Sequence, residues 1–144
     1  MRLSTRGRYA VRSLIDLTVN EGDGFVSLQS ISERQEISLH YLEQIYHKLR
    51  KAGLVKSKKG LGGGYVLARP AGEITVGDII RAVEGPIGPV PCLNPPGKGK
   101  SDCTRVKGCV AHLLWRDLEV RLEEFLDGVN LQQLKERTAK VPCE

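Results

Sequence analysis

The sequence has no long apolar run, and this absence excludes two classes of protein. Residues 1–8 are charged, and they are not followed by the apolar segment that a secretory signal contains. No apolar stretch approaches the length of about 20 residues that a membrane-spanning helix needs. We therefore expect a cytoplasmic protein that has no membrane partner.

Motifs of catalysis are also missing. The glycine-rich stretch at residues 60–64 lacks the G-x-x-x-x-G-K-[ST] pattern of a phosphate-binding loop, and no helix is expected directly after it. No nucleotide-binding motif, and no pair of a nucleophile with a general base, is apparent elsewhere. We therefore expect that the chain is not an enzyme, with a redox enzyme or an electron carrier as the alternative.

Acidic residues are absent from one segment, residues 48–59, in a chain whose formal net charge is +5. The cations of that segment are Lys48, Arg50, Lys51, Lys56, Lys58 and Lys59. A run of cations is usually a solvated face, but its place beside the helices described next favours a nucleic-acid partner. The 144 residues suffice for one domain, or for one small domain with an appendage.

Apolar spacing and capping residues predict three helices in the first third of the chain. A helical stripe covers residues 5–20, and Ser27 is a suitable N-cap for a short helix after it. Ser38 is the N-cap of a second short helix, which ends before Gly53. Its buried side would consist of Leu42, Ile45 and Leu49, and its opposite side of Leu39, His40, Tyr41, Glu43, Gln44 and His47. Two short helices joined by a tight connection indicate a helix-turn-helix.

A β-hairpin is predicted directly after these helices. Residues 54–58 alternate like a strand, residues 59–64 are a glycine-rich turn, and residues 65–68 form the return strand. A hairpin at this place is the wing of a winged helix-turn-helix, and its glycines allow the tip to approach a DNA backbone or minor groove closely. The expected fold class is therefore mainly α with a small β-hairpin wing.

Three cysteines and one histidine form the most informative motif of the chain. Cys92, Cys103, Cys109 and His112 have the spacing Cys-x10-Cys-x5-Cys-x2-His. Thiolate and imidazole are the ligands that zinc and iron–sulfur clusters prefer. Two disulfides would be the alternative in a secreted protein, but a cytoplasmic chain favours metal or redox chemistry. The fourth thiol, Cys143 near the C-terminus, is expected to be a bystander.

A long helix is predicted after the cysteine-rich loop. It would begin at about residue 104 or 106 and end at residue 126. Its apolar stripe consists of Leu114, Leu118, Leu122 and Phe125. This stripe is too long for one small domain to bury, so a dimerisation helix is favoured over an intradomain core helix, because helix-turn-helix proteins commonly bind DNA as symmetric dimers.

A family resemblance is carried by five segments, which are Arg2–Val11, Ile31–Gln35, Ser38–Gln44, Gly62–Tyr65 and His112–Leu118. They resemble the iron–sulfur cluster regulators of the IscR type, within a wider family of dimeric winged-helix transcription regulators. The resemblance implies a [2Fe–2S] cluster, a homodimer and control of iron–sulfur assembly genes. Carried over by motif, the cluster ligands are Cys92, Cys103, Cys109 and His112.

The expected organisation has three parts. Residues 1–85 would be the winged helix-turn-helix domain, residues 86–104 the cluster-binding loop, and residues 105–137 the dimerisation helix with a short terminal helix. The stretch from Cys92 to Cys103 is longer here than in the best-known members of the family. A winged-helix repressor with a structural zinc site, or with a different redox signal, remains the alternative, because three thiolates and one imidazole also suit tetrahedral zinc.

Double-stranded DNA with a pseudo-palindromic operator is the expected partner of the dimer. The residues expected to contact it are Ser38, His40, Tyr41, Glu43, Gln44, Lys56, Lys58, Lys59 and Gly60. A carboxylate such as that of Glu43 accepts a hydrogen bond from cytosine N4, and the amide of Gln44 can pair with adenine. His40 stands where the best-known family members carry a small hydroxyl residue.

Overall fold

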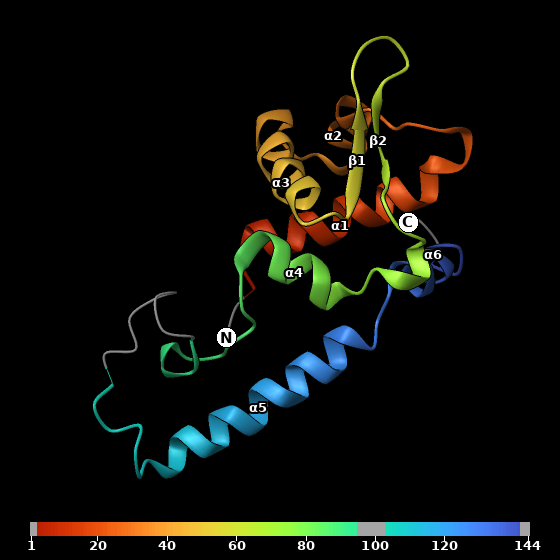
Figure 1. The fold of residues 1–144 in the computed structure, drawn as a ribbon. Coiled ribbons are helices and arrows are strands. Elements are labelled where there is room, and N and C mark those ends of the chain that lie inside the picture. Colours follow the sequence, from red (N-terminus) through yellow and green to blue (C-terminus); the bar gives the residue numbers. More distant parts are fainter. Residues whose placement is uncertain (1–2, 95–102, 142–144) are drawn as a thin grey trace.

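The computed structural model describes residues 3–94 and 103–141, and within them the chain is mostly helical with one small sheet (Figure 1). Its α-helices are α1 (Thr5–Asn20), α2 (Leu28–Gln35), α3 (Leu39–Lys51), α4 (Val76–Glu84), α5 (Val110–Asp127) and α6 (Leu131–Thr138). The strands are β1 (Val55–Lys58) and β2 (Gly64–Leu67), and single 3₁₀ turns are η1 (Glu21–Asp23), η2 (Ala71–Glu73) and η3 (Pro91–Leu93). This confirms the expected mainly α fold with a hairpin wing. None of the helices in the described residues is long and apolar enough to span a membrane.

The helix-turn-helix forms where the capping residues predict it. The Ser27 hydroxyl accepts a hydrogen bond from the Ser30 amide at the start of α2. The Ser38 hydroxyl accepts one from the Tyr41 amide at the start of α3. Between the two helices Glu36 adopts a left-handed conformation with φ of 54°, which turns the chain sharply enough for the helices to pack on each other.

The wing is a two-stranded antiparallel hairpin that is attached firmly at its root. Val55 pairs with Leu67, and the register continues to Lys58 opposite Gly64. The root is joined to the loop before α2 by reciprocal backbone hydrogen bonds between Val26 and Tyr65, of 2.9 and 2.8 Å. A side chain at Gly64 would collide with the Val26 backbone, so only glycine permits this close approach.

One hydrophobic core holds α1, α2, α3 and the wing root together. Tyr46 of α3 is fully buried at its centre, where its hydroxyl donates to the Ser13 carbonyl and its ring packs edge-on against Tyr65 at 4.9 Å. Leu131 of α6 is also fully buried in this cluster. The terminal helix therefore packs against the N-terminal helices and does not continue the line of α5 (Figure 1).

Helix α5 is held on the opposite side of α4 from this core. The capping box of Thr75 and Asp78 starts α4. Arg81 of α4 donates two hydrogen bonds to the Asp127 carboxylate, of 2.7 and 2.9 Å, and lies 3.4 Å from Glu123. The bond from Arg81 is the main reason why the pKa of Asp127 is lowered. The last turns of α5 are thus fixed to α4 and to the helix-turn-helix unit that α4 packs against.

The start of α5 corrects the sequence-based expectation. The helix begins at Val110, later than residue 104 or 106, and ends one residue beyond the expected residue 126. Gly108 has a φ of 93°, a left-handed conformation that a continuous helix cannot contain. Cys109 is consequently the extended N-cap residue of α5 and not part of its first turn.

Candidate nucleic-acid interface and metal centre

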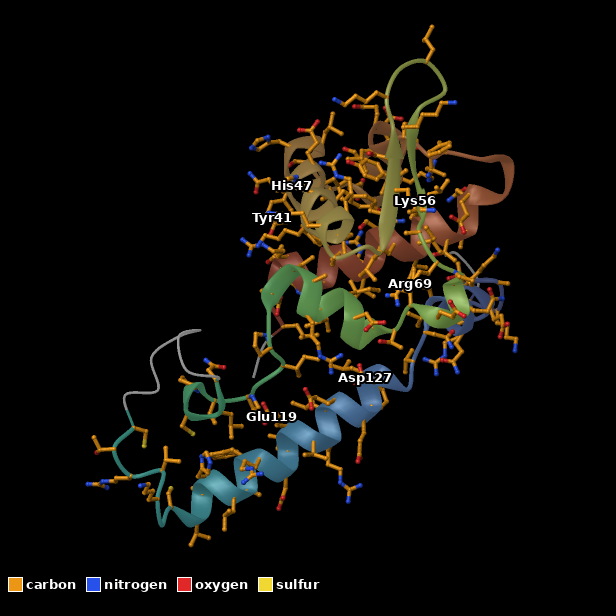
Figure 2. The ribbon with its side chains drawn as sticks, in the orientation of Figure 1. Tyr41, His47, Lys56, Arg69, Glu119 and Asp127 are labelled. Atoms are coloured by element: carbon orange, nitrogen blue, oxygen red, sulfur yellow. The ribbon has the colours of Figure 1, made fainter. Side chains whose placement is uncertain are left out.

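The exposed face of α3 carries the polar residues that were expected to read DNA. His40, Glu43 and Gln44 are exposed, and so is His47 one turn further along. Together with Lys48 they line a shallow hollow of about 460 Å³. Figure 2 shows His47 on this face of α3, in the upper half of the molecule and far from Glu119 and Asp127 on α5.

Side chains on this face already contact one another. The His40 imidazole Nε2 lies 3.1 Å from the Gln44 amide nitrogen, and its Nδ1 lies 3.9 Å from the Glu43 carboxylate. His40 therefore contacts the side chains of both candidate base-reading residues, Glu43 and Gln44, about one helical turn away. This contact depends on an imidazole and is not available to a small hydroxyl side chain.

Two of the expected DNA contacts have structural roles that the sequence pattern did not reveal. Tyr41 is half-buried, not fully exposed, because its ring packs edge-on against Tyr9 of α1 at 5.8 Å. The Arg12 guanidinium group lies over the Tyr9 ring, 5.5 Å from its centre. Ser38 uses its hydroxyl to cap α3, so it orients the recognition helix in addition to any contact with DNA.

The cations of the wing are exposed and lie beside α3. Lys56 and Lys58 are on the outer positions of β1, and Lys59 and Gly60 open the turn that follows. The Lys58 ammonium group lies 5.7 Å from the centre of the Phe25 ring, which limits the directions it can take. The wing therefore presents a basic edge next to the recognition helix, as a phosphate-binding surface requires.

The candidate metal ligands are partly assembled. The Cys92 thiol, in the turn η3, lies 3.4 Å from Nδ1 of His112 in the first turns of α5. Tetrahedral metal bonds of about 2.3 Å to sulfur and about 2.0 Å to nitrogen would put these two atoms about 3.5 Å apart. Two residues that are far apart in the sequence therefore already have the spacing of neighbouring ligands on one metal.

The other two cysteines are not part of this pair. Cys109 is half-buried at the N-cap of α5, and Cys103 is exposed. In residues 3–94 and 103–141, no group of three or more His, Cys, Asp or Glu side chains lies close enough to hold a metal ion. All three described cysteines are free thiols, so the chemistry of the donor set fits a soft metal, while the geometry brings two of the four donors together. Cys143 lies outside the described residues.

A carboxylate lies close to the candidate metal centre. Glu119 lies on α5 two turns beyond His112 (Figure 2). Burial raises its pKa, and the nearby Glu123 carboxylate raises it further, whereas Arg116 and His112 act in the opposite direction. A side chain added at Gly88 would approach Glu119 to 3.4 Å, so the loop after α4 passes closely over this part of α5.

The apolar stripe of α5 divides between two surfaces. Leu122 is half-buried and packs on the small cluster of Val76, Ile80 and Ile87, which belongs to the same chain. Leu118 is half-buried too, whereas Leu114 and Phe125 are 57% and 69% exposed. Further exposed apolar residues of this helix are Val110, Leu113 and Val120.

The sequence comparisons agree with this architecture. The profile of the Rrf2 family, described as an iron-dependent transcriptional regulator, matches residues 3–137. The chain belongs to the Rrf2 family. It is 47% identical over 134 residues to the HTH-type transcriptional regulator IscR of Cronobacter sakazakii, an alignment that covers 93% of this chain and 80% of that protein. The IscR of Klebsiella pneumoniae is equally similar, with 93% and 79% covered.

Solved structures of Rrf2-like regulators have the same fold. IscR of T. potens superposes with a TM-score of 0.76 at 40% identity, covering all of this chain and 94% of that one. CymR of B. subtilis, a global cysteine regulator, also gives a TM-score of 0.76, at 39% identity, with 95% of this chain and 98% of that chain covered. The protein is thus a winged-helix transcriptional regulator of the Rrf2 family and not an enzyme.

Two residues beside the expected DNA contacts were not counted among them. His47 and Lys48 also line the hollow on α3, and the sequence pattern already places His47 on the polar side of that helix and Lys48 in the basic segment. The outer side of α5 carries three more exposed apolar residues that the predicted stripe leaves out, which are Val110, Leu113 and Val120. The apolar positions on both faces of the helix, and not on one stripe alone, would have indicated them. The motif indicates that Cys92 and His112 belong to one donor set, but no signal in the sequence indicated which two of the four donors lie next to each other.

Proposed function

We propose that this Rrf2 protein is a cytoplasmic, homodimeric regulator that senses iron–sulfur cluster supply through a [2Fe–2S] cluster and controls iron–sulfur assembly genes. The observation that carries the proposal is the 3.4 Å approach of Cys92 to His112, in a chain that has two more free thiols nearby in the sequence. The similarity to regulators named IscR supports the same conclusion.

The ligands would be Cys92, Cys103, Cys109 and His112. A cluster bound there supplies one-electron redox chemistry at a potential above that of an all-thiolate site, because imidazole carries less negative charge than thiolate. As the one neutral ligand of the set, the imidazole of His112 would be easier to replace than a thiolate, so the site would be easier to empty than one with four thiolates. An occupancy that follows cluster supply is what a sensor needs.

The position of the ligands suggests how occupancy would reach the DNA-binding unit. Cys92 follows α4 by a short loop, and His112 lies in α5, which Arg81 attaches to α4 at the other end. Ligation by Cys103 and Cys109 would add two attachments between the start of α5 and the turn η3. These attachments would fix the start of α5 relative to α4, and the two DNA-binding units of a dimer would be held in one relative orientation.

The exposed face of α3 would read bases in the major groove, with Glu43 and Gln44 as the principal reading groups. Glu43→Ala is expected to relax discrimination at one base pair of each half-site, by about 1–3 kcal/mol per site, without abolishing binding. Selection of duplexes from a random library, followed by titration of single-base variants, measures this change.

The matched control for this experiment is Glu136→Ala, which removes an equal charge from the exposed surface of α6. It should leave the base preference unchanged. A uniform loss of affinity across all sequences in the Glu43 variant would show that Glu43 supports structure and does not read a base.

The wing cations would bind phosphate. Replacing Lys56 or Lys58 by alanine should weaken binding to every DNA sequence alike, and it should reduce the slope of log K against log salt by about two per symmetric dimer. Titrations between low and moderate salt, with Lys135→Ala on α6 as the control, test this. An unchanged slope would mean that these lysines are solvated charges only.

A second function has one observation in its favour. CymR, named a cysteine regulator, has a fold as similar as that of T. potens IscR. A winged-helix repressor with a structural zinc site, or with a different redox signal, would use the same α3 and wing. Metal content separates the two possibilities, because zinc does not absorb visible light and a [2Fe–2S] cluster does.

A further inference from the structure

The apex of the wing carries a leucine whose side chain is fully exposed. Leu61 is 104% exposed, more than any other large apolar side chain in the described residues. Single exposed apolar residues are common on protein surfaces, so exposure alone indicates no function. The way in which the fold holds Leu61 is more informative.

The turn that presents Leu61 is tight and closed. Gly60 and Gly62 on either side have φ values of 96° and 72°, and the Gly63 amide donates to the Gly60 carbonyl at 3.0 Å. A side chain at Gly63 would lie 2.3 Å from the Lys58 carbonyl oxygen, so the turn has no room to rearrange around a larger residue. Leu61 is therefore presented at a defined apex.

The root of the wing fixes the direction in which the apex points. Besides the Val26–Tyr65 backbone pair, the Leu67 amide donates to the Glu21 carboxylate at 3.0 Å. The hairpin stands out from the body of the molecule beside α3 (Figure 1). A wing whose return strand β2 is attached to the body at two residues presents its apex in a fixed direction.

The surroundings of the apex match a polyanion. Lys58 and Lys59 precede Leu61 within three residues, and Lys56 lies on the same strand, all exposed. These cations would place the apex against the sugar–phosphate backbone next to the site read by α3. An apolar side chain that directly follows a group of cations suits the floor of a DNA groove, where the phosphates lie at the rims and apolar sugar and base edges lie between them.

We propose that Leu61 enters the minor groove beside the sequence read by α3 and acts as an apolar wedge at a flexible base step. Leucine is among the side chains that proteins insert between base pairs, and pyrimidine–purine steps unstack most readily. Burial of the Leu61 side chain would add to the affinity for DNA. It would also favour a pyrimidine–purine step at a position where no hydrogen bond from the protein distinguishes the bases. This inference rests on the proposed DNA-binding function of α3 and the wing.

The test uses duplexes that the unmodified protein selects from a random library, with 2-aminopurine in place of adenine at the step that faces the wing. Fluorescence of 2-aminopurine rises when the base unstacks. Binding of the unmodified protein should raise the fluorescence, Leu61→Met should keep most of the rise, and Leu61→Ser should lose it. Loss of one buried leucine contact per protomer should weaken binding by about ten-fold or more.

The outcomes separate the wedge from the proposed function. Equal fluorescence and affinity for Leu61→Ser and the unmodified protein would overturn the wedge and leave DNA binding intact. A change in sedimentation of Leu61→Ser without DNA would assign Leu61 to a protein contact and would also overturn the wedge. Failure of the unmodified protein to select any sequence would contradict the proposed function itself, and the wedge with it.

Discussion

Alanine at Cys92, Cys103 or Cys109 is expected to abolish cluster binding in this Rrf2 protein. Loss of a side chain that only hydrogen-bonds to a metal ligand lowers metal affinity by about 10- to 100-fold. Loss of the ligand itself should lower the affinity further. Visible absorbance and iron content after anaerobic purification measure the effect. His112→Cys should retain a cluster with a changed spectrum and a lower reduction potential, because a fourth thiolate adds negative charge.

Cys143→Ala is the matched control, because it removes the remaining thiol of the chain. It should change the spectrum and the iron content little, since closing a loop to the end of the chain would cost more entropy than using His112, which already lies beside Cys92. A cluster that survives in His112→Ala and disappears in Cys143→Ala would assign the fourth ligand to Cys143 and contradict the proposed set.

A charge on the outer face of α5 is expected to separate the dimer. Phe125 is 69% exposed and Leu114 is 57% exposed, so Phe125→Glu or Leu114→Glu should yield folded monomers. A dimer binds two half-sites at once, whereas a monomer binds only one. The operator affinity of the monomeric variants should therefore be about 10²- to 10⁴-fold lower than that of the unmodified protein. Sedimentation and operator titration measure the two effects.

Leu122→Glu is the informative comparison, since Leu122 packs on α4 within the same chain. It should lower the thermal stability of the protein, whereas Phe125→Glu should leave thermal stability nearly unchanged apart from the loss of the dimer. An undisturbed dimer in both Phe125→Glu and Leu114→Glu would show that this face of α5 is not the interface.

Local signals predicted most of the DNA-binding unit. Ser27 and Ser38 cap their helices as expected, because a hydroxyl that accepts from a helix-start amide is a local interaction that sequence spacing reveals. Apolar periodicity alone did not locate the start of α5. Gly108 has a left-handed backbone conformation, so the helix begins at Val110 and not at residue 104 or 106 as predicted.

Tertiary packing decided what the pattern could not. Tyr41 was placed on the exposed side of α3 by periodicity, but Tyr9 of α1 covers its ring. Leu122 belonged to the stripe on α5, but α4 supplies an apolar surface for it within the same chain. The spacing of the cysteines and the histidine indicated a metal site, whereas the contact of Cys92 with His112 depends on how the loop after α4 returns to α5.

The most direct test of the proposed function is the visible spectrum of the protein purified without oxygen, with iron and zinc determined on the same sample. A coloured protein with about two iron atoms per chain, whose colour disappears with Cys92→Ala, is the result we expect. A colourless protein that holds about one zinc ion per chain would contradict the cluster and assign the site to structural metal.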